Sequence, residues 1–302
     1  MHITIKNKKD NGVANMKYKD RLGNEFITDS SQEMVLQKLY GSVAGRCILK
    51  VLTRPVISKI AGSFLDTRLS CILNKKFIES NNIDTSQFVM KGHKSFNDCF
   101  TRQIKPGMRE IDMNPEHLIS PCDCKVTAHK ISEGNTFEVK NSVYTVESLL
   151  RDAKLANKFA EGNIIILRLS VDDYHRYCYI DDGVKSRNRF IKGVLHTVNP
   201  IATKYARIYS ENSREYTLLH TKHLGDIIQI EVGALLVGRI KNHHGRYNFE
   251  RGEEKGMFEY GGSTIILITN KDVAVDYDII NNTNEGFETK VKMGEKIGYL
   301  KK

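Results

Sequence analysis

The second half of this chain contains a series of short apolar segments. Four of them are rich in Ile and Val and are separated by Gly, Asn and Asp: NIIILRLSV, RFIKGVLHTV, DIIQIEVGALLVGRI and STIILIT. Apolar runs of this length between turn-forming residues are typical of buried β-strands. The tail GFETKVKMGEKIGYL predicts two more strands around Met293-Gly294, where glycine permits a tight turn. We therefore expect a β-rich domain over residues 116–302.

The preceding segment, residues 31–115, is predicted to be mainly helical. Apolar residues recur at intervals of three and four in two runs, the first ending near Pro55 and the second near Leu73. Lys and Arg interrupt both runs, so neither has the roughly 18 uninterrupted apolar residues of a membrane span. Two alternatives remain open: a helical hairpin buried against the rest of the protein, or a helix pair lying on a membrane surface.

Residues 1–30 form a polar N-terminal extension whose alternating stretches, such as HITIK, indicate a short hairpin packed at an edge. The N-terminus has no apolar signal-peptide region, and the six cysteines are not spaced as a disulfide framework, so we expect a reducing cytoplasm. Cys122 and Cys124 lack the second pair that would indicate zinc, and we predict no metal site.

The 302 residues carry a net charge of +10, which favours an anionic partner, either nucleic acid or a membrane of acidic lipids. The basic residues are spread along the chain and form no recognisable nucleic-acid-binding signature. We therefore predict contact with an anionic membrane surface and none with nucleic acid.

Three polar segments hold side chains suited to chemistry: SPCDCKV with Asp123, LSVDDYHRYC with His175, and FEYGGST with Ser263. Taken singly, each has an ordinary explanation, because Asp caps turns, a lone His is usually structural and Gly-Gly-Ser-Thr is common in turns. However, two glycines before Ser263 allow backbone geometries that present the Gly262 carbonyl to the serine hydroxyl. Such strain suits an N-to-O acyl shift.

In combination and in register, the polar motifs resemble the phosphatidylserine decarboxylase family from about residue 33 onward. The motifs are Ser95–Arg102 (with Cys99 replacing an aromatic residue), Ser120-Pro-x-Asp123, Asp173-Tyr-His-Arg176, Thr197–Pro200, Asn212-Ser-Arg-Glu215, Val232–Gly238 and Gly261-Gly-Ser-Thr264. Seven motifs in this order are specific to the family, whereas any one of them alone is not.

The resemblance implies a proenzyme that cuts itself between Gly262 and Ser263 into a β chain, 1–262, and an α chain, 263–302, which remain together as a heterodimer. Ser263 would become a covalent pyruvoyl cofactor, whose ketone forms a Schiff base with the amine of phosphatidylserine. The products would be phosphatidylethanolamine and carbon dioxide. Such an enzyme would be peripheral on the cytoplasmic side of the cell membrane.

We accordingly predict an α+β fold with a helical, membrane-facing N-terminal region packed on a β-rich catalytic domain. The predicted regions are 1–30, 31–115 and 116–302, with the site where Asp123, His175 and Ser263 converge.

The histidines are where this chain departs from the family pattern. The family's self-cleavage uses an Asp, a His and the Ser as a unit, and Asp123 and Ser263 match two of the three. Cys178 stands where the histidine would be, while His175 matches the histidine that supports decarboxylation. Either His175 serves both steps, or another histidine compensates, or the chain does not mature. We favour compensation and predict His196, for which an ordinary surface position is the alternative.

Two arginines, Arg176 and Arg214, are predicted to hold the substrate phosphate or carboxylate, since a guanidinium binds such groups bidentately. Ion pairs with neighbouring acidic residues are the alternative. Cys124 replaces the glycine usual after the aspartate, which leaves the geometry of that turn open.

Two other functions fit part of the pattern. One is a pyruvoyl enzyme acting on a soluble amino acid, against which the apolar helical runs argue. The other is a non-enzymatic β-sandwich carrier module, in which the Lys292-Met293-Gly294 turn merely resembles a lipoyl hairpin.

Overall fold

The main body of the protein is built on one large, mostly antiparallel sheet, seen in a computed structural model that describes residues 17–27, 38–139, 142–198, 206–234, 239–259 and 263–301. The sheet has 11 strands in the order β14-β9-β11-β12-β16-β7-β4-β18-β1-β2, with β10 also paired to β11. Their bounds are β14 Tyr247–Phe249, β9 Gly183–Lys185, β11 Arg214–Thr221, β12 Asp226–Val232, β16 Ser263–Thr269, β7 Asn163–Leu169, β4 Cys124–Lys130, β18 Glu288–Val291, β1 Lys17–Lys19, β2 Glu25–Ile27 and β10 Arg189–Ile191.

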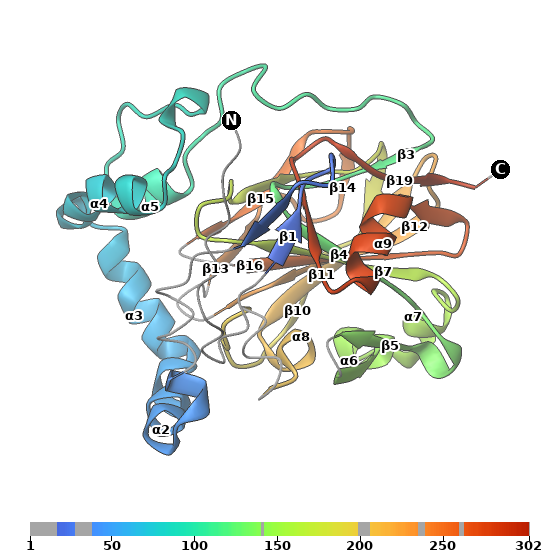
Figure 1. The fold of residues 1–302 in the computed structure, drawn as a ribbon, viewed down its shortest axis with the longest axis horizontal. Coiled ribbons are helices and arrows are strands. Elements are labelled where there is room, and N and C mark those ends of the chain that lie inside the picture. Colours follow the sequence, from blue (N-terminus) through green and yellow to red (C-terminus); the bar gives the residue numbers. More distant parts are fainter. Residues whose placement is uncertain are drawn as a thin grey trace.

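Smaller elements cover this sheet on both faces (Figure 1). There are three small sheets in the described part of the chain. The first consists of β13 (Arg239–Asn242), β15 (Glu254–Glu259) and β8 (Arg176–Cys178), and the second of β17 (Val273–Val275), β19 (Lys296–Leu300) and β3 (His117–Ile119). The third is the pair of β5 (Thr136–Val139) and β6 (Ser142–Thr145). The helices of this part are η3 (Glu133–Asn135), α6 (Val146–Leu150), α7 (Ala153–Asn157), α8 (Ile208–Glu211) and α9 (Tyr277–Asn284).

The two faces of the large sheet belong to two separate hydrophobic cores. On β16, Ile265 and Leu267 pack into one core, whereas Ile266 and Ile268 pack into the other. A strand buried on both faces needs apolar residues at every position rather than at every second one. This explains why STIILIT and NIIILRLSV read as continuous apolar runs, and both predicted strands are confirmed as β16 and β7.

The helical region forms a separate group beside the sheets (Figure 1). It comprises a turn of helix ending at Gly41, α2 (Val43–Leu52), α3 (Pro55–Leu65), η1 (Arg68–Cys71), α4 (Ile72–Ser80), η2 (Thr85–Gln87) and α5 (Phe96–Phe100). The first predicted run ends before Pro55, which opens α3, as proline at a first helical position does. The second run is interrupted after Leu65 and resumes at Arg68.

A third core joins this helical region to the β-rich part. Phe77 of α4 and Phe100 of α5 pack in one cluster with Tyr174, which lies just before β8. No helix among the described residues is long and apolar enough to cross a membrane. The predicted α+β class is confirmed, whereas the domain boundaries stay a prediction.

The predictions for the tail, for RFIKGVLHTV and for the N-terminal hairpin differ in outcome. The tail forms β18 and β19 on either side of Met293-Gly294, as predicted. RFIKGVLHTV is a strand only over β10; beyond it, Val194 forms an isolated bridge with Asn212. The polar N-terminus contains the hairpin β1–β2 at the edge of the large sheet. HITIK itself lies outside the described residues.

The turn at Gly294 provides a test of this packing. Its φ is +88°, and an added Cβ would overlap the carbonyl oxygen of Glu110. Gly294→Ala is therefore expected to lower the free energy of unfolding by about 2 kcal/mol, measured by denaturant titration. Gly245→Ala is the control, because a Cβ there has no neighbour within 4 Å. Equal effects of the two changes would contradict the account.

Candidate active site

Ser263 is the first residue of β16 and lies between two neighbouring strands. It is the Cα partner of Leu169 on β7, and the next residue, Thr264, is the partner of Val232 on β12. Its side chain is completely buried, and its Oγ has no hydrogen-bond partner among the described residues. Buried polar atoms without partners are rare and often mark functional sites. Gly262, the other half of the predicted cleavage site, lies outside the described residues.

His175 is completely buried at the start of β8, close to the strand that leads to Ser263. Its ring centroid lies 4.1 Å from that of Phe100, and its Nδ1 lies 3.0 Å from the carbonyl oxygen of Asp173. A carbonyl oxygen can only accept a hydrogen bond, so in the neutral ring Nδ1 carries the proton and Nε2 is the basic atom. The His175 carbonyl also accepts a 2.9 Å bond from Phe258 N on β15.

The loop that carries His175 is held by a buried ion pair. The Asp173 carboxylate accepts bonds from Ser170 N at 2.7 Å and from Lys125 Nζ at 3.1 Å. Burial raises the pKa of Asp173, and the charge of Lys125 opposes that rise. These contacts fix the end of β7 relative to His175.

Asp123 has an arginine as its ionic partner. Arg109 Nε donates to it at 2.8 Å, a second guanidinium nitrogen donates to its other oxygen, and Met293 N donates at 2.9 Å. Burial alone would lower the pKa of Arg109, but the bond and the charge of Asp123 outweigh it and raise that pKa. Within the described residues, this carboxylate is bonded to no histidine.

Cys178 occupies the predicted position of the missing histidine, on β8 beside Asp123. Its backbone N donates to the Pro121 carbonyl at 2.9 Å, and its side chain is buried. Burial raises the pKa of this thiol to about 12. The thiol is therefore protonated at neutral pH and cannot accept the serine proton.

His196 is half-buried, and its ring lies against the helical region. Its Nδ1 lies 3.3 Å from the Tyr40 hydroxyl, and its Nε2 lies 4.0 Å from the Glu211 carboxylate. Burial lowers the pKa of His196, and Glu211 opposes that shift. Asn212 bonds to both backbone groups of His196 and to the carbonyl of Gly233, the residue after Val232. The backbone of His196 is thus tied to the strand beside Ser263, while its ring faces Tyr40.

The two predicted substrate-binding arginines have different surroundings. Arg176 donates to Glu254 at 2.9 Å and to the Thr101 carbonyl at 2.8 Å, and it lines two adjoining cavities of about 220 and 190 Å³. Arg214 is completely buried and donates to the main-chain carbonyls of Ser148, Leu149, Ser210 and Asn212. Arg176 therefore lines cavities that a ligand could enter, whereas Arg214 uses its donors to hold the main chain of the segments around it. Substrate binding stays a prediction for both.

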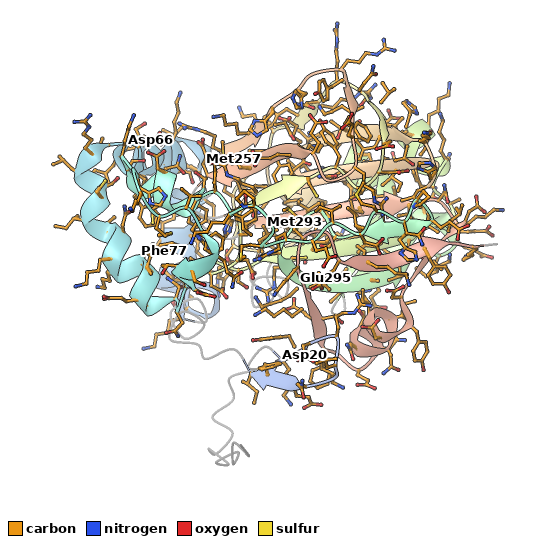
Figure 2. All side chains as sticks on the ribbon, turned by 90° about the horizontal axis from the view of Figure 1, so that it is seen from above. Asp20, Asp66, Phe77, Met257, Met293 and Glu295 are labelled. Carbon is orange, nitrogen blue, oxygen red and sulfur yellow. The ribbon has the colours of Figure 1, made fainter. Side chains whose placement is uncertain are left out.

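The cavity next to Arg176 lies at the junction of the helical and β-rich parts. Met293 and Cys178 are part of its lining, and Met293 also packs with the cluster that contains Phe77. Figure 2 shows Phe77 on the helices and Met257 and Met293 on the adjoining side of the β-rich part.

Two functional candidates were missed from the sequence: Arg109, and the buried pair of Glu231 and Lys255, whose charged atoms lie 2.7 Å apart. Glu231 had a detectable signal, because it is a charged residue inside the apolar run DIIQIEV. Arg109 had none, because nothing local in the sequence links it to Asp123.

Sequence comparison with known proteins identifies the family. The family model described as phosphatidylserine decarboxylase matches residues 96–299. The chain is 46% identical over 265 residues to phosphatidylserine decarboxylase proenzyme 2 of Clostridium acetobutylicum, covering 87% of this chain and 91% of that protein. It is 40% identical to the proenzyme of Clostridium novyi (87% and 92% covered) and 37% identical to that of Desulfitobacterium hafniense (94% and 98% covered).

The chain belongs to the phosphatidylserine decarboxylase family. This confirms the resemblance and the predicted carboxy-lyase activity, and it excludes the carrier-module alternative. The cofactor of the family is a covalent pyruvoyl group, produced when the proenzyme is processed.

The thiols around Asp123 give a prediction of differential reactivity. Burial raises the pKa of both Cys122 and Cys178, whereas Cys47 is exposed. At pH 7.5, iodoacetamide is expected to modify Cys47 at least about tenfold faster than Cys122 or Cys178, because it reacts with accessible thiolates. Peptide mass mapping measures this, and full alkylation in denaturant is the control. Rapid native modification of Cys178 would show that its thiol is not held as described.

Proposed function

We propose that this chain converts phosphatidylserine to phosphatidylethanolamine and carbon dioxide, using a pyruvoyl group made from its own Ser263. The observation that carries the proposal is the burial of the Ser263 hydroxyl, without a partner among the described residues, at the start of β16. A buried hydroxyl that makes no other hydrogen bond keeps its lone pairs available for attack on the preceding peptide bond. The match of Gly261-Gly-Ser-Thr264 to the family motif supports the same residue.

The surroundings of Ser263 fit a prosthetic group that is formed in place. The residue is enclosed between β7 and β12, so a group replacing it is shielded from water. A pyruvoyl group at this position would supply a ketone that serves as the electron sink for decarboxylation. His175, with its proton on Nδ1, offers Nε2 for proton transfer and is oriented by Phe100 and Asp173.

The substrate headgroup is proposed to bind beside Arg176. This guanidinium borders two cavities and follows His175 directly in the chain. Its present partner Glu254 has a side chain 37% exposed, so a phosphate or carboxylate can exchange with it at the cavity surface. Arg214 is kept as a positioning residue in the proposal, since four carbonyl oxygens take up its donors.

For self-cleavage we propose that His196 helps to position the strand beside Ser263, because Asn212 links its backbone to Gly233. His175 keeps its proposed role in proton transfer during decarboxylation. Asp123 is proposed to anchor the β18–β19 turn through Met293, with Arg109 neutralising its charge.

The position of β16 explains how two cleavage products act as one enzyme. A cut after residue 262 releases a chain whose first strand is paired on both sides, with β7 and with β12. The buried ion pair between Arg168 and Glu288 also joins the two products. We therefore propose a heterodimer that persists without a covalent link.

We propose that helices α2 to α4 lie on an anionic membrane, with the enzyme peripheral on its cytoplasmic side. Large apolar side chains at least half exposed gather on this region: Val43, Ile48, Val51, Val56, Ile60, Phe64, Leu69 and Ile72. Lys and Arg residues are interspersed among them, and Figure 1 shows these helices beside the sheets. Exposed apolar side chains with interspersed cations suit the interface of an acidic bilayer.

The Ser263 proposal predicts a simple result. Ser263→Ala is expected to remain a single uncut chain of about 34 kDa with no decarboxylase activity, because it has no nucleophile. Denaturing gels and carbon dioxide release measure this. Ser58→Ala is the control, since Ser58 is also a buried serine whose hydroxyl lacks a partner among the described residues. An active or cleaved Ser263→Ala protein would refute the assignment.

The membrane proposal predicts a site-specific loss of binding. Ile60→Glu and Phe64→Glu together are expected to weaken sedimentation with phosphatidylglycerol-containing vesicles by at least about tenfold, since each apolar side chain contributes about 1.5–3 kcal/mol. Phe190→Glu is the matched control, because Phe190 is 63% exposed and Ile60 65%. Equal losses from both proteins would argue against a membrane-binding helical face.

A further inference from the structure

A completely buried ion pair, Lys255 and Glu231, lies between the large sheet and the β13-β15-β8 sheet. Lys255 Nζ on β15 lies 2.7 Å from Glu231 Oε1 on β12 and 2.7 Å from Asn242 Oδ1 on β13. Asn242 Nδ2 in turn donates to Glu231 Oε2 at 3.2 Å. Burying two charges costs desolvation energy that their attraction barely offsets, so stability alone is a weak reason for such a pair.

The strand register brings this pair close to Ser263. Glu231 is the Cα partner of Ile265 on β16, and partners in an antiparallel ladder project from the same face. Ser263 precedes Ile265 by two residues and therefore shares that face. Glu231 and Ser263 are thus diagonal neighbours, whose Cα atoms are typically about 7–8 Å apart, within reach of a long side chain.

The other buried ion pairs of the described sheet are on the wrong face for Ser263. Arg168, which pairs with Glu288, is the Cα partner of both Thr264 and Lys125. Arg168 and Lys125 therefore project from the face of Thr264, opposite to Ser263. Of the buried pairs that the structure describes in this sheet, Lys255–Glu231 is the one on the nucleophile's face.

Self-cleavage in this chain also lacks the family's histidine at position 178, where Cys178 stands. The Cys178 thiol is protonated at neutral pH, and the described ring contacts of His196 are with Tyr40 and Glu211. Glu231 places a buried carboxylate on the same face as the Ser263 hydroxyl, one ladder diagonal away, and a proton acceptor has first to lie within reach of the proton that it takes. Hydrogen bonds of this kind often shorten only as the reaction proceeds.

We propose that Glu231 is the proton acceptor for Ser263 during self-cleavage, with Lys255 and Asn242 as positioning residues that hold its carboxylate. The inference rests on the proposed function and deepens it. The Ser263 Oγ–H proton passes to Glu231 as Oγ bonds to the Gly262 carbonyl carbon. The Gly262–Ser263 C–N bond then breaks, and Glu231 returns the proton to the amide nitrogen. The product is an ester, and no oxidant or reductant is consumed.

The test measures maturation and not turnover. Full-length protein is produced with Glu231→Gln, and the fraction cut is followed over time by denaturing mass spectrometry. Loss of a general base is expected to slow cleavage by at least about 100-fold. Hydroxylamine, which cleaves esters, is expected to cut wild-type protein captured during maturation but not Glu231→Gln, because the ester does not form.

Two further variants separate this role from a structural one. Glu231→Leu with Lys255→Met removes both charges, so no unpaired charge is buried, and it is expected to fold but remain uncut. The matched control is Glu288→Leu with Arg168→Met, a buried pair on the opposite face, which is expected to mature within about threefold of the wild-type rate.

The outcomes are distinct. Maturation of Glu231→Gln, or of the folded Glu231→Leu/Lys255→Met protein, at the wild-type rate would overturn the inference alone. Hydroxylamine cleavage of Glu231→Gln would also overturn it, by showing that the ester forms without this carboxylate. A wild-type chain that stays uncut would overturn the proposed function as well.

Discussion

The pairing of β16 with a strand on each side is the constraint on which the rest of this structure depends. β7 pairs with β16 from Ser263 to Thr269 and β12 from Thr264 to Thr269, and both faces of β16 are buried in separate cores. Ser263, the proposed nucleophile, is therefore the first residue of a strand that its neighbours hold in place. A cut just before that residue removes one covalent link but none of these ladders, so a new chain end forms inside an intact core.

The period of two along β16 then determines which groups can act on the serine. Ser263 and Ile265 face the small β13-β15-β8 sheet, while Thr264 faces the side of Arg168. A slip of one residue would exchange these faces and place the hydroxyl beside a different ion pair. The apolar residues after Ser263 hold this register, because Ile265 and Leu267 pack into one core and Ile266 and Ile268 into the other. The seven residues of β16 therefore determine both how the two cores pack against the strand and which side chains lie near Ser263.

Local patterns in the sequence predicted β7, β16 and the β18–β19 turn, because an apolar run or a turn glycine is visible without its neighbours. The family motifs predicted Ser263 and His175 as site residues. The contacts that assign roles were not predictable in this way. Arg109 bonds to Asp123 from the linker after α5, Asn212 joins His196 to Gly233, and Glu231 meets Lys255 across two sheets. Each of these depends on long-range pairing, which has no local signature.

The central claim is that residue 263 becomes a ketone, and labelling of carbonyl groups tests it most directly. The purified protein is treated with a hydrazide reagent, denatured, and analysed by mass spectrometry to locate the label. The account predicts a label confined to residue 263, at the beginning of a fragment 263–302 that co-purifies with fragment 1–262. An unlabelled, uncut chain, or a label on any other residue, would contradict it.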